Sequence, residues 1–144
     1  MIVESVLVHK GNQVTTIDPI ATIRRAADRM REQNIGALVV MRFGEIVGVL
    51  SERDIVHAFA RYGDRLASMA VKEIVASDFV TIAPQDNLKR AMTLMTLHRT
   101  RHLVVLRDDD ELAGIISIGD VVKYRLSDLE LESNVLRDLY IATH

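Results

Sequence analysis

Hydrophobic and polar positions follow one order along the first half of the chain and repeat it in the second half. Each copy opens with a short β-rich run, and apolar residues spaced three and four apart then predict a helix with one buried face. Two aliphatic runs follow, which indicate a strand buried on both faces and its antiparallel partner across a turn. We expect these strands at Val14–Ile17, Ile35–Met41 and Glu45–Leu50, and again at Phe79–Ile82, Thr100–Leu106 and Glu111–Ile116. A second helix closes each copy, so the pattern predicts a β-α-β-β-α unit that occurs twice.

The second helix of each copy starts within the same string of residues. Residues 48–55 read as a glycine, two aliphatic residues, a serine, two variable residues, an aspartate and an aliphatic residue, and residues 114–121 repeat that order. The two repeats are offset by 65 residues from Thr16 to Thr81 and by 66 residues from Gly48 to Gly114. The one additional residue of the second repeat falls within residues 107–111, a polar hairpin turn, where an insertion is tolerated best. We therefore divide the chain into repeat 1 at residues 1–66 and repeat 2 at residues 67–144, with Arg61–Met69 as the connector.

The predicted fold class is mixed α/β (α+β), with two pseudo-symmetric repeats and a long C-terminal helix. Thr22 and Asn87 fit N-caps of the first helices, because a short polar side chain there accepts from free backbone N–H groups. After Asp120 the helix can continue toward the C-terminus, since apolar residues recur at alternating steps of four and three if Ser133 fills one place. These residues are Val122, Leu126, Leu129, Leu136 and Tyr140.

Composition excludes several classes of protein. A net charge of −2 and an aromatic content of 4% argue against a nucleic-acid binder, which would present a basic face or stacking platforms. The absence of cysteine excludes disulfides, thiolate metal sites and cysteine nucleophiles. The start of the chain does not read as a signal peptide, and no apolar run approaches the roughly 18–20 residues that span a bilayer. We expect a soluble cytoplasmic protein that binds neither nucleic acid nor membrane.

The repeated string places a hydroxyl and a carboxylate at each helix start, Ser51 with Asp54 and Ser117 with Asp120. Backbone N–H groups without intrahelical partners lie beside them, and these groups together with the helix dipole attract phosphate. A carboxylate competes with phosphate for the same donors, so its expected role is to accept hydrogen bonds from the two hydroxyls of a ribose. A capping box explains the same residues without any ligand. Both interpretations stay open on the sequence.

A duplicated β-α-β-β-α unit whose last helix opens with this string resembles the CBS domain, and two in tandem resemble the CBS pair, or Bateman module. The resemblance extends from about Val3 to at least Tyr124, and residues 34–40, 51–54, 99–105 and 117–123 are similar to the small stand-alone CBS-pair proteins of bacteria. It implies two repeats packed as one module. It also implies adenosyl ligands in clefts between the repeats: AMP, ADP, ATP, NAD(H) or S-adenosylmethionine.

The resemblance implies roles for residues outside the repeated string. Arg101 and His102, at the start of the buried strand of repeat 2, correspond to basic residues that contact phosphate in CBS proteins. Thr15, Thr16 and Thr81 begin or line the first strands, whose backbone meets the adenine in this family.

The two repeats differ in charge at corresponding positions. Where repeat 2 has Arg101 and His102, repeat 1 has Gly36 and Ala37, and repeat 1 alone carries an arginine, Arg53, directly before its aspartate. Arginine pairs with phosphate bidentately and keeps its charge, whereas histidine must be protonated to do so fully. We therefore expect Arg101 and Arg53 as phosphate partners, and phosphorylated ligands at the site that Arg101 reaches.

The last helices of the repeats also predict self-association. In CBS pairs these helices form the interface of a flat dimer, and the segment from Asp54 to Tyr62 carries apolar residues at Ile55, Val56 and Phe59. We expect a homodimer, with the last turns of the C-terminal helix as an added clasp.

No catalytic residue, metal site or obligatory cofactor is expected. The sequence shows no nucleophile elbow and no glycine-rich phosphate loop. A helix-to-strand boundary separates His98 from His102, and the acidic turn Asp108–Glu111 lacks an EF-hand pattern. The predicted function is regulatory: the protein binds an adenosyl nucleotide and signals in trans to an unidentified effector protein. The alternatives are a constitutive homodimerisation or interaction module without a physiological ligand, and a minor nucleotide-processing activity.

Overall fold

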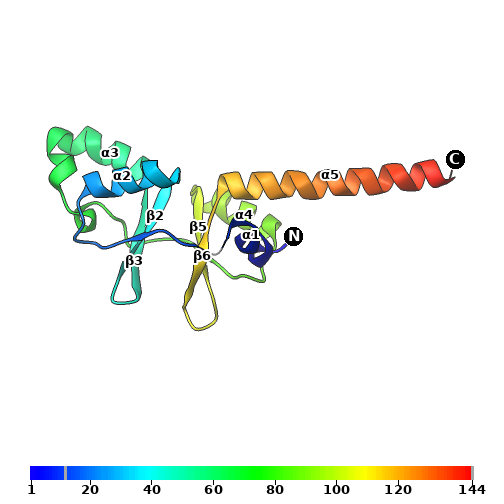
Figure 1. Cartoon of the computed structure of the whole chain (residues 1–144), viewed down its shortest axis with the longest axis horizontal. Helices are drawn as coiled ribbons and strands as arrows, with labels where there is room; N and C mark the ends of the chain where they lie inside the picture. Colours follow the sequence, from blue (N-terminus) through cyan, green and yellow to red (C-terminus); the bar gives the residue numbers. More distant parts are fainter. Residues whose placement is uncertain (12, 144) are drawn as a thin grey trace. The chain divides into compact units, whose positions relative to one another are not determined.

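The computed structural model describes residues 1–11 and 13–143, and the chain forms two compact units (Figure 1). One unit contains residues 14–79. The other combines the N-terminal residues up to 13 with the chain from Val80 onward. The repeat boundary between residues 66 and 67 stays a prediction from the sequence.

The unit of residues 14–79 contains one three-stranded sheet and its helices. In chain order these are β1 (Thr16–Ile17), α2 (Ile23–Gln33), β2 (Ala37–Arg42), β3 (Glu45–Ser51), α3 (Glu52–Tyr62) and the 3₁₀ turns η1 (Gly63–Ser68) and η2 (Val71–Glu73). Helix α3 ends at Tyr62 with Gly63 as its C-cap, and the connector that follows is ordered, since Leu66 is buried in the core of this unit.

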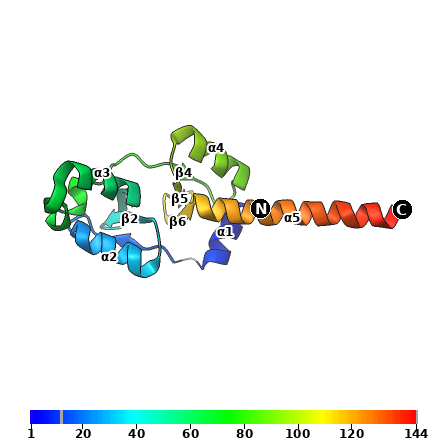
Figure 2. The ribbon, with the colours of Figure 1, turned by 90° about the horizontal axis from the view of Figure 1, so that it is seen from above.

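The second unit repeats that order and adds a helix at each end. It contains α1 (Val3–Lys10), β4 (Thr81–Ile82), α4 (Leu88–His98), β5 (His102–Leu106), β6 (Leu112–Ser117) and α5 (Ile118–Thr143). The long C-terminal helix is therefore confirmed. Helix α5 runs past α1 and α4 and then continues by itself (Figures 1 and 2).

Both sheets have the same topology. The central strand pairs in parallel with the first strand and antiparallel with the third, in the orders β1-β2-β3 and β4-β5-β6. Each hairpin shifts register once, between Val40 and Met41 and between Val105 and Leu106. The predicted mixed α/β class and the duplicated unit are confirmed, because both units contain the predicted strand, helix, strand, strand and helix in that order.

Helix starts follow the capping residues that the sequence predicts. The side chain of Thr22 accepts from the backbone N–H of Arg25, and that of Asn87 accepts from Arg90. The apolar spacing of residues 88–95 predicts Met92 on the buried face of α4 together with Met95, and this prediction is wrong: Met92 is 42% exposed, whereas Leu94 is buried beside Met95. The buried face of α4 therefore includes Leu94 in addition to Leu88, Ala91 and Met95, and it leaves Met92 at its exposed border.

The N-terminal helix α1 is an element that the hydrophobic pattern did not predict. Its first residues dock by backbone bonds, with the N–H of Val3 donating to the carbonyl of Asp86 and that of Glu4 to Pro84, both at 2.8 Å. Val3, Val6 and Leu7 then complete the core of the second unit. Apolar burial against the sheet, rather than a strong helical pattern, holds this helix.

The glycine of the repeated string lies against a backbone carbonyl in one unit and against a side chain in the other. A Cβ atom at Gly48 would lie within van der Waals overlap of the backbone carbonyl oxygen of Ala76, at 2.3 Å. At Gly114 it would meet the end of the Leu7 side chain, Cδ2 at 2.6 Å. A side-chain tip can rotate away, but a backbone carbonyl cannot move without its whole segment.

Gly48→Ala is therefore expected to destabilise the fold by about 1–3 kcal/mol, the usual cost of overpacking. Gly114→Ala is the matched control and is expected to cost less, because Leu7 can change rotamer. Urea denaturation of both variants measures the difference in the free energy of unfolding. Equal losses at the two glycines would contradict this explanation.

No helix among the described residues is long and apolar enough to cross a membrane.

Candidate functional site

The repeated serine lies where the last strand of each sheet turns into a helix. In the first unit Ser51 ends β3 opposite Ala37, and the N–H of Glu52 donates to the carbonyl of Gly36 at 3.0 Å. In the second unit Ser117 ends β6 opposite His102, and the N–H of Ile118 donates to Arg101 at 2.8 Å. The sheet thus fixes the start of the following helix, and with it the direction of the first free N–H groups.

Asp54 and Ser51 hold each other in a capping box, which we call the Asp54 corner. The backbone N–H and the hydroxyl of Ser51 donate to Oδ2 of Asp54 at 2.8 and 2.9 Å. The N–H of Asp54 donates back to the Ser51 hydroxyl at 3.2 Å. No described residue donates to Oδ1 of Asp54, so this oxygen can accept from a ligand.

Asp120 and Ser117 repeat this arrangement, which we call the Asp120 corner. The N–H of Ser117 donates to Oδ2 of Asp120 at 2.8 Å, and the N–H of Asp120 donates to the Ser117 hydroxyl at 3.1 Å. The capping interpretation of both serine–aspartate pairs is therefore confirmed. Capping uses one oxygen of each carboxylate, so it does not exclude a ligand at the other.

Lys10 distinguishes the Asp120 corner from the Asp54 corner. From the end of α1 its ammonium group donates to Oδ2 of Asp120 at 2.7 Å and to the carbonyl of Ile115 at 2.8 Å. The two side chains are partly buried, 31% exposed for Lys10 and 20% for Asp120. The repeat pattern could not reveal this pair, because Lys10 lies outside the duplicated unit.

These contacts change the acidity of Asp120. Burial alone would raise the pKa of its carboxyl group, but the hydrogen bond from Lys10 and the backbone hydrogen bond from Ser117 outweigh burial and hold the pKa below its ordinary value of 3.8. Asp120 is therefore a carboxylate at neutral pH, and its charge is matched by an ammonium group of the same chain.

The predicted basic residues fall in different places. Arg101 and His102 lie beside the Asp120 corner, since the carbonyl of Arg101 accepts from the first turn of α5 and His102 pairs with Ser117. The side chain of Arg101 is exposed, and that of His102 is half-buried. Arg53 lies in the first turn of α3 with an exposed side chain, next to Asp54. Each unit thus holds one acidic corner with at least one arginine nearby.

Thr16 and Thr81 lie on the edge strand that is farther from the serine in each sheet, and Thr15 directly precedes β1. Thr16 pairs with Val39 of β2, and Thr81 pairs with Val104 of β5, so a central strand separates them from Ser51 and Ser117. The hydroxyl of Thr15 donates to Oε1 of Gln33, and Arg29 donates to the carbonyl of Thr16. Their role at an adenine stays a prediction.

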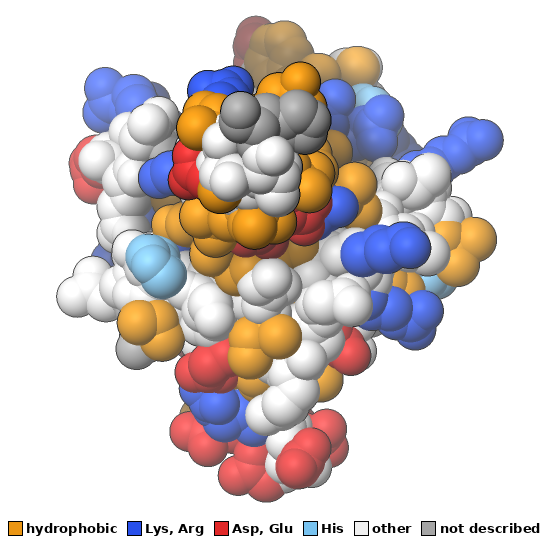
Figure 3. All heavy atoms as spheres, turned by 90° about the vertical axis from the view of Figure 1, so that its right-hand side faces the viewer, with side chains coloured by type: hydrophobic (Ala, Val, Ile, Leu, Met, Phe, Trp, Pro, Cys, Tyr) orange, Lys and Arg blue, Asp and Glu red, His pale blue; other side chains and the backbone are white. Residues whose placement is uncertain are grey.

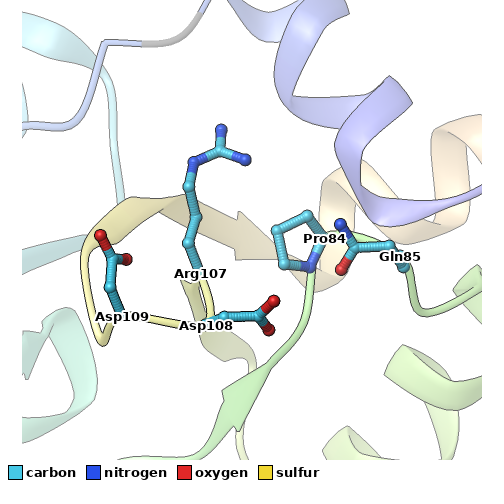
Figure 4. Close-up of a pocket in the computed structure, with 5 residues that line it drawn as sticks. All are labelled: Pro84, Gln85, Arg107, Asp108 and Asp109. Carbon is cyan, nitrogen blue, oxygen red and sulfur yellow. The ribbon is translucent and has the colours of Figure 1, made fainter.

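A surface hollow of about 310 Å³ lies elsewhere in the second unit, lined by Pro84, Gln85, Arg107, Asp108 and Asp109 (Figure 4). Asp108 points toward Pro84, while Asp109 turns away from it. Arg107 is already paired with Glu4 at 3.2 Å, a contact that raises the pKa of Arg107. The hollow contains none of the predicted site residues.

Because the pKa of Asp120 is lowered, its ion pair stabilises the folded protein above pH 3.8, and this contribution is lost as the pH falls through the lowered value. Lys10→Met should therefore melt a few degrees below the wild-type protein at pH 7 and show a smaller deficit near pH 3. Thermal melting between these pH values measures the difference, with Lys89→Met on the exposed surface of α4 as the matched control. A deficit independent of pH would contradict the pairing.

The chain resembles known proteins along most of its length. The CBS domain family matches it twice, at residues 3–61 and 71–127. A curated relative, the CBS domain-containing protein YhcV of Bacillus subtilis (strain 168), is 34% identical over 115 residues, which cover 80% of this chain and 81% of that protein.

Solved structures show the same architecture. A CBS-domain-containing protein from Agrobacterium tumefaciens superposes with a TM-score of 0.83 at 36% identity, covering 87% of this chain and 99% of that one. A CBS domain protein from Pyrobaculum aerophilum, whose structure is complexed with AMP, superposes with a TM-score of 0.77 at 29% identity, covering 92% of this chain and 99% of that one.

Proposed function

Since the chain belongs to the CBS-domain family, we propose that it is a regulatory module that binds adenosyl nucleotides at its acidic corners and signals in trans to a separate protein. The observation that carries the proposal is the pair of equivalent carboxylates, each at a helix start, in a fold shared with a CBS protein that is complexed with AMP. The candidate ligands are AMP, ADP, ATP, NAD(H) and S-adenosylmethionine. The cytoplasm stays the expected compartment.

The chemistry of the corners supports a ribose ligand. Each carboxylate is held by a serine through one oxygen, which fixes its orientation without using its full capacity as an acceptor. Two adjacent ribose hydroxyls can donate to such a carboxylate, as they do to acidic residues in other nucleotide-binding folds. Arg53 in one unit and Arg101 in the other supply positive charge for phosphate groups. We assign no catalytic step to these groups.

A thermal-shift screen with AMP, ADP, ATP, NADH and S-adenosylmethionine tests this function. A ligand at 100 times its dissociation constant stabilises the folded protein by about 2.7 kcal/mol, which raises the melting temperature by several degrees. Asp54→Asn together with Asp120→Asn should abolish the shift. Ser51→Ala and Ser117→Ala are matched controls, because they remove the capping hydroxyl but keep the carboxylate.

The serine variants should melt earlier and still respond to the ligand, since a lost cap costs about 0.5–2 kcal/mol without removing the ribose acceptor. If none of the five compounds shifts the melting temperature at millimolar concentration, the sensor function is wrong. Consumption of a ligand in the same mixtures would point instead to nucleotide processing.

Lys10 gives the Asp120 corner a preference for anionic ligands under this proposal. A ribose whose two hydroxyls bind both oxygens of Asp120 competes with the ammonium group for Oδ2. A phosphate on the ligand offers that ammonium a new partner, whereas a neutral nucleoside does not. The lysine stem is flexible enough to follow the phosphate.

In an Asp54→Asn background, which leaves only the Asp120 corner, Lys10→Met should weaken AMP binding and strengthen adenosine binding. The ratio of the two affinities is expected to fall about two- to tenfold, the range of a partly exposed charge contact. Isothermal titration calorimetry measures both ligands, with Lys89→Met as the control. Equal losses for AMP and adenosine would assign Lys10 a purely structural role.

The exposed apolar faces of the last helices support the homodimer that is common to the sensor and to the second candidate, a homodimerisation module. On α3, Val56 and Phe59 are more than half exposed, and on α5 Val122 is 51% exposed and Ile118 nearly as much. Side chains of this kind are covered when two copies associate. A dimer is also part of the sensor function, so the two candidates differ only in whether a ligand changes its stability.

A further inference from the structure

The distal half of α5 extends beyond both the CBS match and the body of its own unit. The family match ends at residue 127, whereas the helix continues to Thr143. Asp128, in the middle of α5, pairs with the N-terminal amino group at 3.2 Å. Every described residue from Leu129 onward is exposed. An isolated helix of this length is marginal in water, so it needs a partner surface to persist.

One face of α5 has the regular spacing of a coiled-coil seam. Apolar residues follow steps of four and three from Val122 to Tyr140, with Ser133 as the single polar member. The seam includes Leu129, which is 44% exposed, and Leu136, which is 67% exposed. Figure 3, in which the C-terminal end of α5 faces the viewer, shows apolar side chains along the flank of this helix.

The opposite face does not form an equivalent seam. Its spacing runs through Leu131 and Val135 but also through Asp128 and Asp138. A charged carboxylate at a buried seam position is costly unless it is paired. Asp128 already has its partner within the chain. The seam from Val122 to Tyr140 is therefore the better surface for another helix.

The charges that flank the seam indicate which helix can pair with it. With Leu126 and Ser133 at a positions, Arg125 and Glu132 occupy g positions, and Glu130 and Arg137 occupy e positions. In a parallel, in-register pair of helices each g residue lies beside the e′ residue five positions later on the other helix. Arg125 then meets Glu130 of the second copy, and Glu132 meets its Arg137. None of the four is in an ion pair among the described residues.

We propose that α5 from Val122 to Thr143 pairs with the same segment of a second copy of this chain as a parallel two-stranded coiled coil. This pairing extends the dimer of the proposed function and fixes its orientation, because both C-termini must lie at the same end. It does not depend on a nucleotide.

Single cysteines test the pairing, because the chain contains no cysteine of its own. In the full-length protein, Ser133→Cys in the seam should form a disulfide-linked dimer under mild oxidation, and Thr143→Cys near the end of the same seam should do so as well. Asn134→Cys and Val135→Cys, on the other faces, are matched controls and should stay mostly monomeric. Non-reducing electrophoresis reads the result, and circular dichroism confirms that each variant keeps its helix content.

Three outcomes would overturn the proposal. A folded Ser133→Cys variant that does not cross-link excludes this seam, and efficient cross-linking of Val135→Cys assigns the contact to the opposite face. Cross-linking at residue 133 without residue 143 indicates an antiparallel crossing. None of these results bears on the nucleotide shift, so the two proposals fail separately.

The flanking charges supply a second test in the Ser133→Cys background. Glu130→Arg should slow cross-linking about two- to fivefold, because it places like charges side by side across the seam. Adding Arg125→Glu should restore the rate, since it reverses both members of the pair. Equal rates in all three proteins would show that these charges do not face each other.

Discussion

The central strand of each sheet sets the constraint that the rest of its unit satisfies. Residues 38–40 and residues 103–105 are buried, so each strand needs a neighbour on both edges and cover on both faces. The antiparallel neighbour must then lead directly into a helix, and this requirement fixes the residue at which the helix begins. Ser51 and Ser117 stand at that junction. The acidic corners are therefore a consequence of how the core is enclosed.

Local spacing explains how far the sequence could predict the structure. The caps at Thr22 and Asn87 and the Ser51–Asp54 capping box involve residues no more than three apart, so they can be inferred from the order of residue types. The contact of Lys10 with Asp120 joins residues 110 positions apart, and it exists only because α1 packs on the second unit. No pattern within either repeat contains that information.

The two repeats therefore share a backbone but differ in charge. Oδ1 of Asp54 is open to a donor, whereas Asp120 already interacts with a cation of its own chain. The charge of Asp120 is compensated by Lys10 in the absence of a ligand, whereas Asp54 gains a compensating partner only when a ligand donates to it. Under the proposed function, the two sites of the duplicated unit therefore differ in selectivity, because one short helix, α1, adds Lys10 beside only one of them.

The two glycines of the repeated string, Gly48 and Gly114, occupy equivalent positions but avoid contact with different groups. Gly48 makes room for a main-chain carbonyl, and Gly114 makes room for the side chain of Leu7 in α1, a helix outside the duplicated β-α-β-β-α unit. Selection can thus retain the same residue at equivalent positions for unrelated reasons. A chimaera built from two copies of residues 14–79 would keep the motif intact yet lack α1, which packs against its second glycine. Sequence identity between the repeats therefore does not mean that one repeat can replace the other in the fold.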